Sequence, residues 1–123
     1  MKHNQIYFRA EFTIEEGKTG EYKKLVEDMS RMVEANEPGT LNYQFYIDES
    51  ETKCIVNETY ANSEAIFAHI AGVASQTILP KIFMVSRISK HDVCGNPSKE
   101  LQKVLTGFGS QTYIPLAGFN RGS

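Results

Sequence analysis

The chain has 123 residues, of which 41% are hydrophobic and 23% charged, a composition that favours one globular domain over a fibrous or disordered chain. Its net charge of −2 argues against a nucleic-acid partner, because binding to phosphates favours a basic excess. Apolar runs such as 82–85 are far shorter than the about 20 residues that cross a bilayer, so we expect no membrane partner. The two cysteines, Cys54 and Cys94, lack CxxC spacing, which indicates structural thiols in the cytoplasm.

Alternation of apolar and polar side chains predicts the strands. Residues 6–14 alternate cleanly and residues 41–47 alternate again. Residues 53–60 return as a further strand, and the polar turn 48–51 joins it to 41–47 in an antiparallel hairpin. The apolar segment from Lys81 to Lys90 is expected to form the last strand of the core.

Apolar spacings of three and four predict helices between these strands. One stripe runs from Tyr22 to Val33, and the helix ends at Glu37-Pro38-Gly39 because proline cannot continue it. A second helix is expected from about Ser63 to Ala71, with a further turn around 75–79 compatible with the sequence. A third, small helix is expected after residues 95–98, with its apolar face formed by Leu101, Val104, Leu105 and Phe108.

The element order β-α-β-β-α-β predicts an α+β, ferredoxin-like split βαβ fold with a core at about 6–90 and a C-terminal helix and arm at about 95–123. The arm is too apolar for a solvated linker, so we expect it to pack on its own subunit or on a partner. Two helices cover one sheet face, and we expect the open face to pair two copies into a homodimer, the alternative being a solvated surface. The open face would carry Tyr7, Arg9, Glu11, Asn42, Gln44, Tyr46, Ile55, Asn57 and Thr59.

Three segments carry a family resemblance: residues 37–43 (EPGTLNY), residues 56–65 (VNETYANSEA) and His69 one turn later. With the element order, they resemble the antibiotic biosynthesis monooxygenase (ABM) domain family over about residues 6–90, and Gly118-Phe119-Asn120-Arg121 resembles the tail of one uncharacterised branch of it. The resemblance implies a single ABM-like domain over 1–123, a dimeric α+β barrel, and a cleft between sheet and helices.

Enzymes of that family oxidise quinols or polycyclic phenols with molecular oxygen and need no metal or flavin, while other members degrade haem and many have no demonstrated activity. The haem-degrading members use an asparagine on the first strand and a tryptophan at the end of the third. This chain has no asparagine in its first strand and has Tyr60 at the tryptophan position, which disfavours haem chemistry.

His69 is the first candidate catalytic residue, because it lies at the margin of the helix face that packs on the sheet and could act as a base. Glu58 shares a strand face with Val56 and Tyr60, and beneath a helix its carboxylate must be paired or protonated. We expect Glu58 to contact His69 or a backbone donor, and Tyr60 or Tyr43 to donate to an oxyanion. The alternatives are a packed border histidine and a structural buried acid.

The predicted substrate-binding residues are mainly aromatic, although such rings also fill ordinary cores. They are Phe8, Tyr43, Phe45, Phe67, Phe83 and Arg87. Arg87 would meet an anionic substrate or oxygen intermediate, or form a salt bridge across the dimer, whereas His3 and His91 are expected at the surface. No metal or cofactor is expected, because HExxH, P-loop and GxGxxG motifs are absent and the three histidines have no ligand spacing.

The sequence therefore favours a cofactor-independent monooxygenase acting on a small hydroxylated aromatic compound or quinol. Two alternatives stay open. The first is a non-catalytic dimeric module that binds a small ligand, and the second is a haem-binding or haem-degrading relative.

Overall fold

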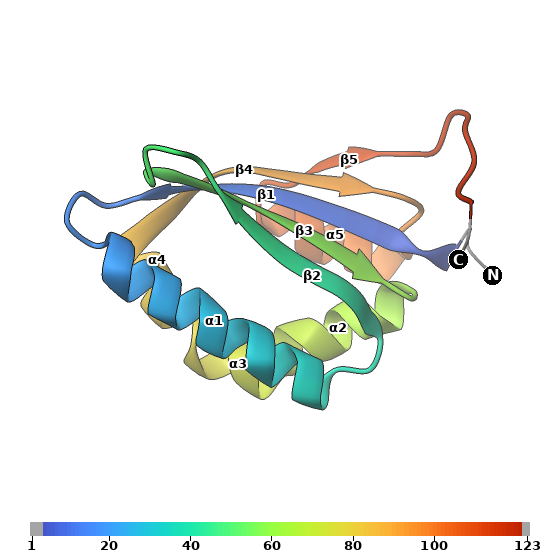
Figure 1. Ribbon diagram of the computed structural model, residues 1–123. Helices are drawn as coiled ribbons and strands as arrows, with labels where there is room; N and C mark the ends of the chain where they lie inside the picture. The colour runs from blue at the N-terminus through green and yellow to red at the C-terminus, as the bar shows by residue number, and fades with distance from the viewer. Residues whose placement is uncertain (1–3, 122–123) are drawn as a thin grey trace.

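The computed structural model describes residues 4–121 and places five helices against one face of a five-stranded sheet (Figure 1). The strand order is β2-β3-β1-β4-β5, in which the first four strands are antiparallel and β5 lies parallel to β4. This is the predicted α+β ferredoxin-like fold, with a small helix and an edge strand added at the C-terminus. The elements are β1 (Ile6–Ile14), α1 (Thr19–Asn36), β2 (Thr40–Ile47), β3 (Lys53–Tyr60), α2 (Ser63–Ala71), α3 (Val73–Thr77), α4 (Leu79–Val85), β4 (Ser86–Cys94), α5 (Lys99–Gly107) and β5 (Gln111–Tyr113).

The elements up to α2 lie where the sequence patterns predict them. Every second residue of β1 is buried, and α1 buries a stripe from Tyr22 to Val33 against the same sheet face. α2 begins after Asn62, whose side chain accepts a hydrogen bond from the backbone N–H of Ala65. The residues predicted for the open face are all exposed or half-buried, and the pairing of Tyr7 with Thr59 and of Gln44 with Asn57 places them on one surface.

The predicted strand from Lys81 to Lys90 is wrong in its first half. Residues Leu79–Val85 form helix α4, with Pro80 in its first turn, and the strand runs from Ser86 to Cys94. Ile82 and Val85 are buried, whereas Phe83 and Met84 between them are exposed, which is the i, i+3 pattern of a helix. A run of four consecutive apolar residues shows no period, so it could not separate helix from strand.

β4 contains one extra residue relative to β1. Phe12 pairs with Ile88 and Glu11 pairs with Lys90, which leaves Ser89 as a β-bulge. Because side chains alternate along a strand, the extra residue lets Ile88 and His91 both point toward the helices. Arg87 pairs with Thr13 and lies exposed on the open face.

The C-terminal segment adds a second small core. Leu101 and Leu105 of α5 are fully buried against Ile6, Phe8 and Val93. The predicted packing of the arm on its own subunit is confirmed for β5, which pairs with β4 beside Asp92–Cys94. The apolar residues that follow are exposed: Ile114, Leu116 and Phe119.

Candidate active site

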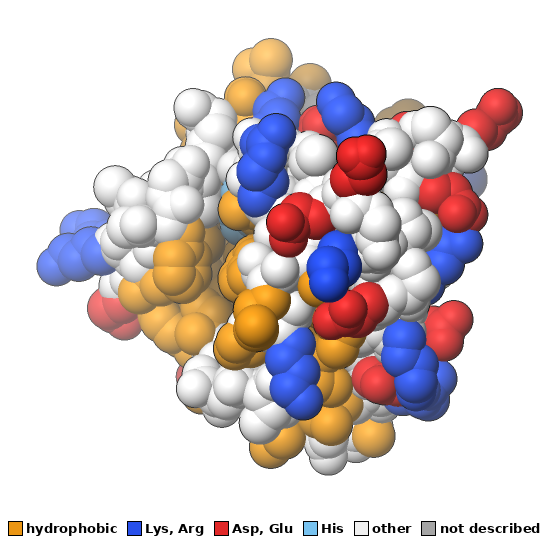
Figure 2. Space-filling model, turned by 90° about the vertical axis from the view of Figure 1, so that its left-hand side faces the viewer, with side chains coloured by type: hydrophobic (Ala, Val, Ile, Leu, Met, Phe, Trp, Pro, Cys, Tyr) orange, Lys and Arg blue, Asp and Glu red, His pale blue; other side chains and the backbone are white. Residues whose placement is uncertain are grey.

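A cavity of about 350 Å³ lies between the sheet and the helices. In the space-filling view, hydrophobic side chains border a recess in which a histidine is visible (Figure 2). Of the predicted lining residues, Phe8, Tyr43, Phe45 and Phe83 contact the cavity. The complete lining is Phe8, Ala10, Phe12, Tyr43, Phe45, Val56, Glu58, His69, Ile70, Ser75, Gln76, Leu79, Ile82, Phe83, Ile88, His91, Leu105 and Phe108.

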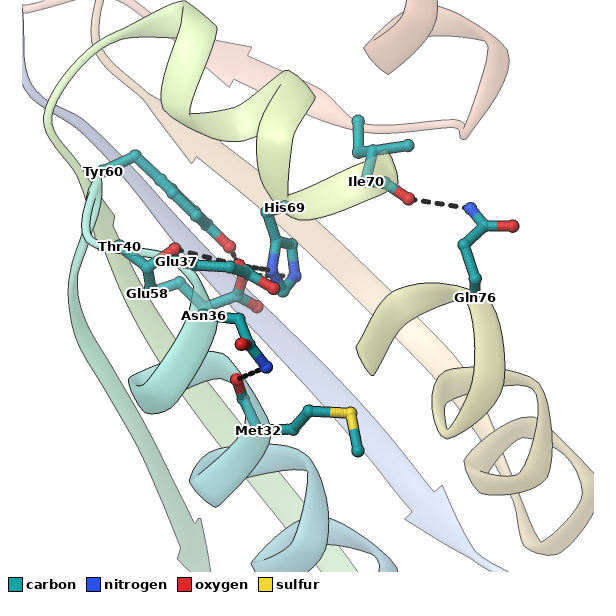
Figure 3. Close-up of polar contacts among 9 residues, drawn as sticks. All are labelled: Met32, Asn36, Glu37, Thr40, Glu58, Tyr60, His69, Ile70 and Gln76. Atoms are coloured by element: carbon teal, nitrogen blue, oxygen red, sulfur yellow. Dashed lines mark hydrogen bonds and ion pairs between the residues drawn. The ribbon is translucent and has the colours of Figure 1, made fainter. Parts of the chain in front are cut away.

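His69 contacts this cavity from the last turn of α2 and is held there by a buried carboxylate. Its Nδ1 atom lies 2.6 Å from Oε1 of Glu37, the residue at the C-terminal end of α1 (Figure 3). The same oxygen accepts a hydrogen bond from the Thr40 hydroxyl at 3.2 Å. Because a carboxylate only accepts hydrogen bonds, Nδ1 carries the proton and Nε2 is left as the acceptor of the ring.

Glu37 was not predicted as a functional residue. It entered the predictions only as part of the segment that ends the first helix and as part of the family motif. Two glycines allow α2 to pack closely against the end of α1. A Cβ atom on Gly39 would lie 2.6 Å from the Cβ of Ala65, and a Cβ on Gly72 would lie 2.8 Å from Oε2 of Glu37. Glycine at both positions therefore lets α2 approach closely enough for Glu37 to reach His69. An acid directly before Pro-Gly in a shared motif was the signal that could have identified it.

Glu58 points from β3 toward the same histidine. Its Oε1 atom lies 3.9 Å from Nε2 of His69, so the expected proximity is observed, and the Tyr60 hydroxyl donates a hydrogen bond to the same oxygen (Figure 3). Burial raises the pKa of Glu58, an effect that a protonated His69 and the hydrogen bond from Tyr60 oppose. This environment favours the protonated carboxyl group, which can donate a hydrogen bond or a proton.

The rings of two tyrosines flank the imidazole. Ring centroids lie 5.6 Å from His69 for Tyr43 and 5.5 Å for Tyr60. Burial raises the pKa of both tyrosines well above 10.0, so both keep their hydroxyl protons near neutral pH. Tyr43 contacts the cavity, whereas Tyr60 is fully buried and reaches the cavity through its contacts with lining residues, including Glu58 and His69.

Three further expectations need correction. Phe67 packs against the core cluster around Ile66 and Leu101 and does not line the cavity, because it lies on the other side of α2. Arg87 lies on the open sheet face, so its predicted contact with substrate is wrong, whereas the alternative, a salt bridge across the dimer, stays a prediction. His91 is half-buried at the cavity wall and not at the surface, whereas His3 lies outside the residues that the structure describes.

This arrangement suits proton transfer at an apolar surface. Nε2 of His69 faces Glu58 and the cavity, Glu37 fixes the ring, and neighbouring hydroxyl groups remain donors. Over residues 4–121 no group of three metal-ligating side chains comes together, and no helix there is both long and apolar enough to span a membrane.

The family model for antibiotic biosynthesis monooxygenases matches residues 6–79. The chain belongs to this family. The matched segment of the monooxygenase family includes Glu37, Glu58, Tyr60 and His69, whereas β4, α5 and β5 lie beyond it. No curated protein matches the sequence.

Several solved structures of other proteins have the same fold as this chain. MupZ from Pseudomonas fluorescens superposes with a TM-score of 0.81 at 22% identity, covering 96% of this chain and 95% of MupZ. SnoaB from Streptomyces nogalater, a cofactor-independent oxygenase, superposes with a TM-score of 0.66 at 12% identity, covering 78% of this chain and 96% of SnoaB. At these identities the likeness concerns the fold, and the reaction has to be argued from the site.

Proposed function

We propose that this protein is a cofactor-independent monooxygenase that acts on a small hydroxylated aromatic compound or quinol. The observation that carries the proposal is the buried His69–Glu37 pair, at 2.6 Å, in the wall of an apolar, aromatic cavity. Membership of the monooxygenase family supports it, and so does the fold shared with SnoaB.

In the proposed mechanism, Nε2 of His69 removes the proton of a phenolic hydroxyl, and the Glu37 carboxylate stabilises the imidazolium that forms. The phenolate is electron-rich and reacts with molecular oxygen held beside it in the cavity. For a phenol with a free ring position, phenol and O₂ give quinone and water. One oxygen atom enters the ring, the other leaves as water, and all four electrons come from the substrate.

The remaining groups stabilise negative charge on oxygen as the reaction proceeds. The Glu58 carboxyl group, whose pKa is raised by burial, and the Tyr43 hydroxyl, which keeps its proton, both border the cavity. Tyr60 holds Glu58 in place through its hydrogen bond. Fixed donors of this kind are most effective in a site from which water is excluded.

The test is oxygen consumption and product analysis with a panel of phenols and quinols. A general base contributes about 10²–10⁴-fold to a rate, so His69→Ala and Glu37→Ala should lose at least about 100-fold. Glu34→Ala is the matched control for Glu37→Ala, because Glu34 lies one turn earlier on α1 and is exposed. Binding without turnover would support the non-catalytic binding module instead, and a His69→Ala variant as active as the parent would refute the proposed mechanism.

We further propose a cytoplasmic homodimer that forms through the open sheet face. Members of the family are typically dimeric, and the open face carries exposed aromatic groups such as Tyr7 and Tyr46. Both cysteines are free thiols, compatible with a reducing compartment. Light scattering should give twice the chain mass, and Ile55→Arg in the middle of the face should give a monomer with an unchanged fold.

A further inference from the structure

The cavity has a second wall, which lies outside the segment that matches the family. This wall consists of Ile88 and His91 from β4, of Leu105 from α5, and of Phe108, which directly follows α5. Phe83 and Phe108, which are 47% and 64% exposed, border the cavity where it meets solvent. The C-terminal part of the chain therefore decides what this half of the cavity recognises.

His91 faces Glu58 across the floor of the cavity. Glu58 pairs with Phe8 of β1, and Ala10 of β1 pairs with His91, so β1 separates the two polar groups. Two strand spacings of about 4.8 Å, together with the offset of two residues along β1, put their backbones roughly 12 Å apart. The Phe8 ring on β1 contacts His91, with ring centroids 4.8 Å apart, and also Tyr60, the hydrogen-bond partner of Glu58, with ring centroids 5.1 Å apart.

The imidazole of His91 is oriented by one hydrogen bond. Its Nδ1 atom lies 2.7 Å from the hydroxyl oxygen of Ser110, whereas its Nε2 atom has no hydrogen-bond partner within residues 4–121. Burial lowers the pKa of His91, so the ring is neutral near pH 7. Because the Ser110 hydroxyl can donate or accept, either tautomer is satisfied, and Nε2 can correspondingly accept or donate.

We propose that His91 binds a second oxygen substituent of the substrate, at the edge remote from His69. The inference rests on the proposed function and narrows its substrate class to aromatic compounds with oxygen atoms on opposite edges of the ring system. One such oxygen meets His69 and Glu58, the other meets Nε2 of His91, and Phe8 packs against the rings between them. A neutral imidazole that can donate or accept serves a hydroxyl and a carbonyl equally, so it tolerates oxidation of the substrate from phenol to quinone.

The test measures binding without turnover, under anaerobic conditions, with two probes that differ in one hydroxyl group: 2,6-dihydroxynaphthalene and 2-naphthol. The wild type should bind the diol about tenfold more tightly, the value of one well-made hydrogen bond. His91→Phe should abolish this preference, so that the diol and 2-naphthol bind with equal affinity. His91→Gln, which retains a donor and an acceptor, should restore part of it, and Ser110→Ala should reduce it by less than His91→Phe.

Circular dichroism and the unfolding midpoint of each variant show whether it is folded. Equal affinity of the wild type for both probes would overturn the inference, and so would a His91→Phe variant that binds both probes more weakly by the same factor. If the proposed function holds while the inference fails, binding and His69-dependent oxygen consumption persist but do not respond to His91. Failure of both probes to bind the wild type would overturn the inference together with the substrate class on which it rests.

Discussion

Removing the carboxylate that holds His69 should be among the most destabilising single changes in this protein. Glu37→Ala deletes the acceptor of two hydrogen bonds, from Nδ1 of His69 at 2.6 Å and from the Thr40 hydroxyl at 3.2 Å. The His69 and Glu37 side chains are 9% and 5% exposed, so water cannot replace the missing acceptor.

The expected magnitude follows from this burial. Hydrogen bonds to a charged group contribute about 1.5–3 kcal/mol each, and Glu37→Ala removes two of them. We therefore expect Glu37→Ala to lower the free energy of unfolding by about 3–5 kcal/mol. Glu37→Gln keeps an acceptor oxygen for both donors and should cost about 1–2 kcal/mol.

Urea denaturation at pH 7 measures the difference, provided that the slope with denaturant is the same for all variants. Glu34→Gln, on the exposed side of α1, should stay within about 0.5 kcal/mol of the wild type. A Glu37→Ala variant within about 1 kcal/mol of the parent would refute the reasoning, since Glu37 would then not be the partner on which buried His69 depends.

Further predictions concern the close contacts and Glu58. Gly72→Ala places a Cβ 2.8 Å from Oε2 of Glu37 and should lower the free energy of unfolding by about 1–3 kcal/mol. In a Glu37→Ala background the loss should be smaller, and an equal loss in both backgrounds would show that the carboxylate is not the obstacle. Gly39→Ala should cost a similar amount because its Cβ would lie 2.6 Å from that of Ala65, and Ala65→Gly should restore part of it; strictly additive costs would contradict this. The raised pKa of Glu58 means that the folded state holds a proton that the unfolded state releases, so stability contributed by this group is lost as pH rises above about 4.5. Unfolding curves from pH 4 to 8 should show Glu58→Gln gaining stability relative to the wild type as pH rises, and a constant difference would count against the shift.

The sequence predicted correctly those elements in which the spacing of apolar side chains is regular over many residues. β1 alternates over nine residues and α1 carries its stripe from Tyr22 to Val33, so tertiary packing and local pattern agree. Leu79–Val85 is shorter, and its four consecutive apolar residues fit either a helix or a strand. Pro80 was the local clue to a helix, because proline is well placed in a first turn.

The candidate site was predictable only in part. Alternation placed Glu58 on the inner face and helical spacing placed His69 above it, which together brought the two side chains close. Glu37 was not found, since its contact with His69 joins residues 32 positions apart and depends on how α2 approaches the end of α1. The position of His91 depended on a bulge, which no alternating pattern reveals before the pairing with β1 is known.

The bulge at Ser89 makes the composition of the cavity wall sensitive to chain length as well as to residue identity. Deletion of Ser89 would restore strict alternation along β4, and one half of the strand would then turn its side chains over. Either Ile88 or His91 would leave the interior without any substitution in the cavity itself. Insertions and deletions of one residue at this point are thus a route by which proteins of the same fold could exchange one substrate preference for another.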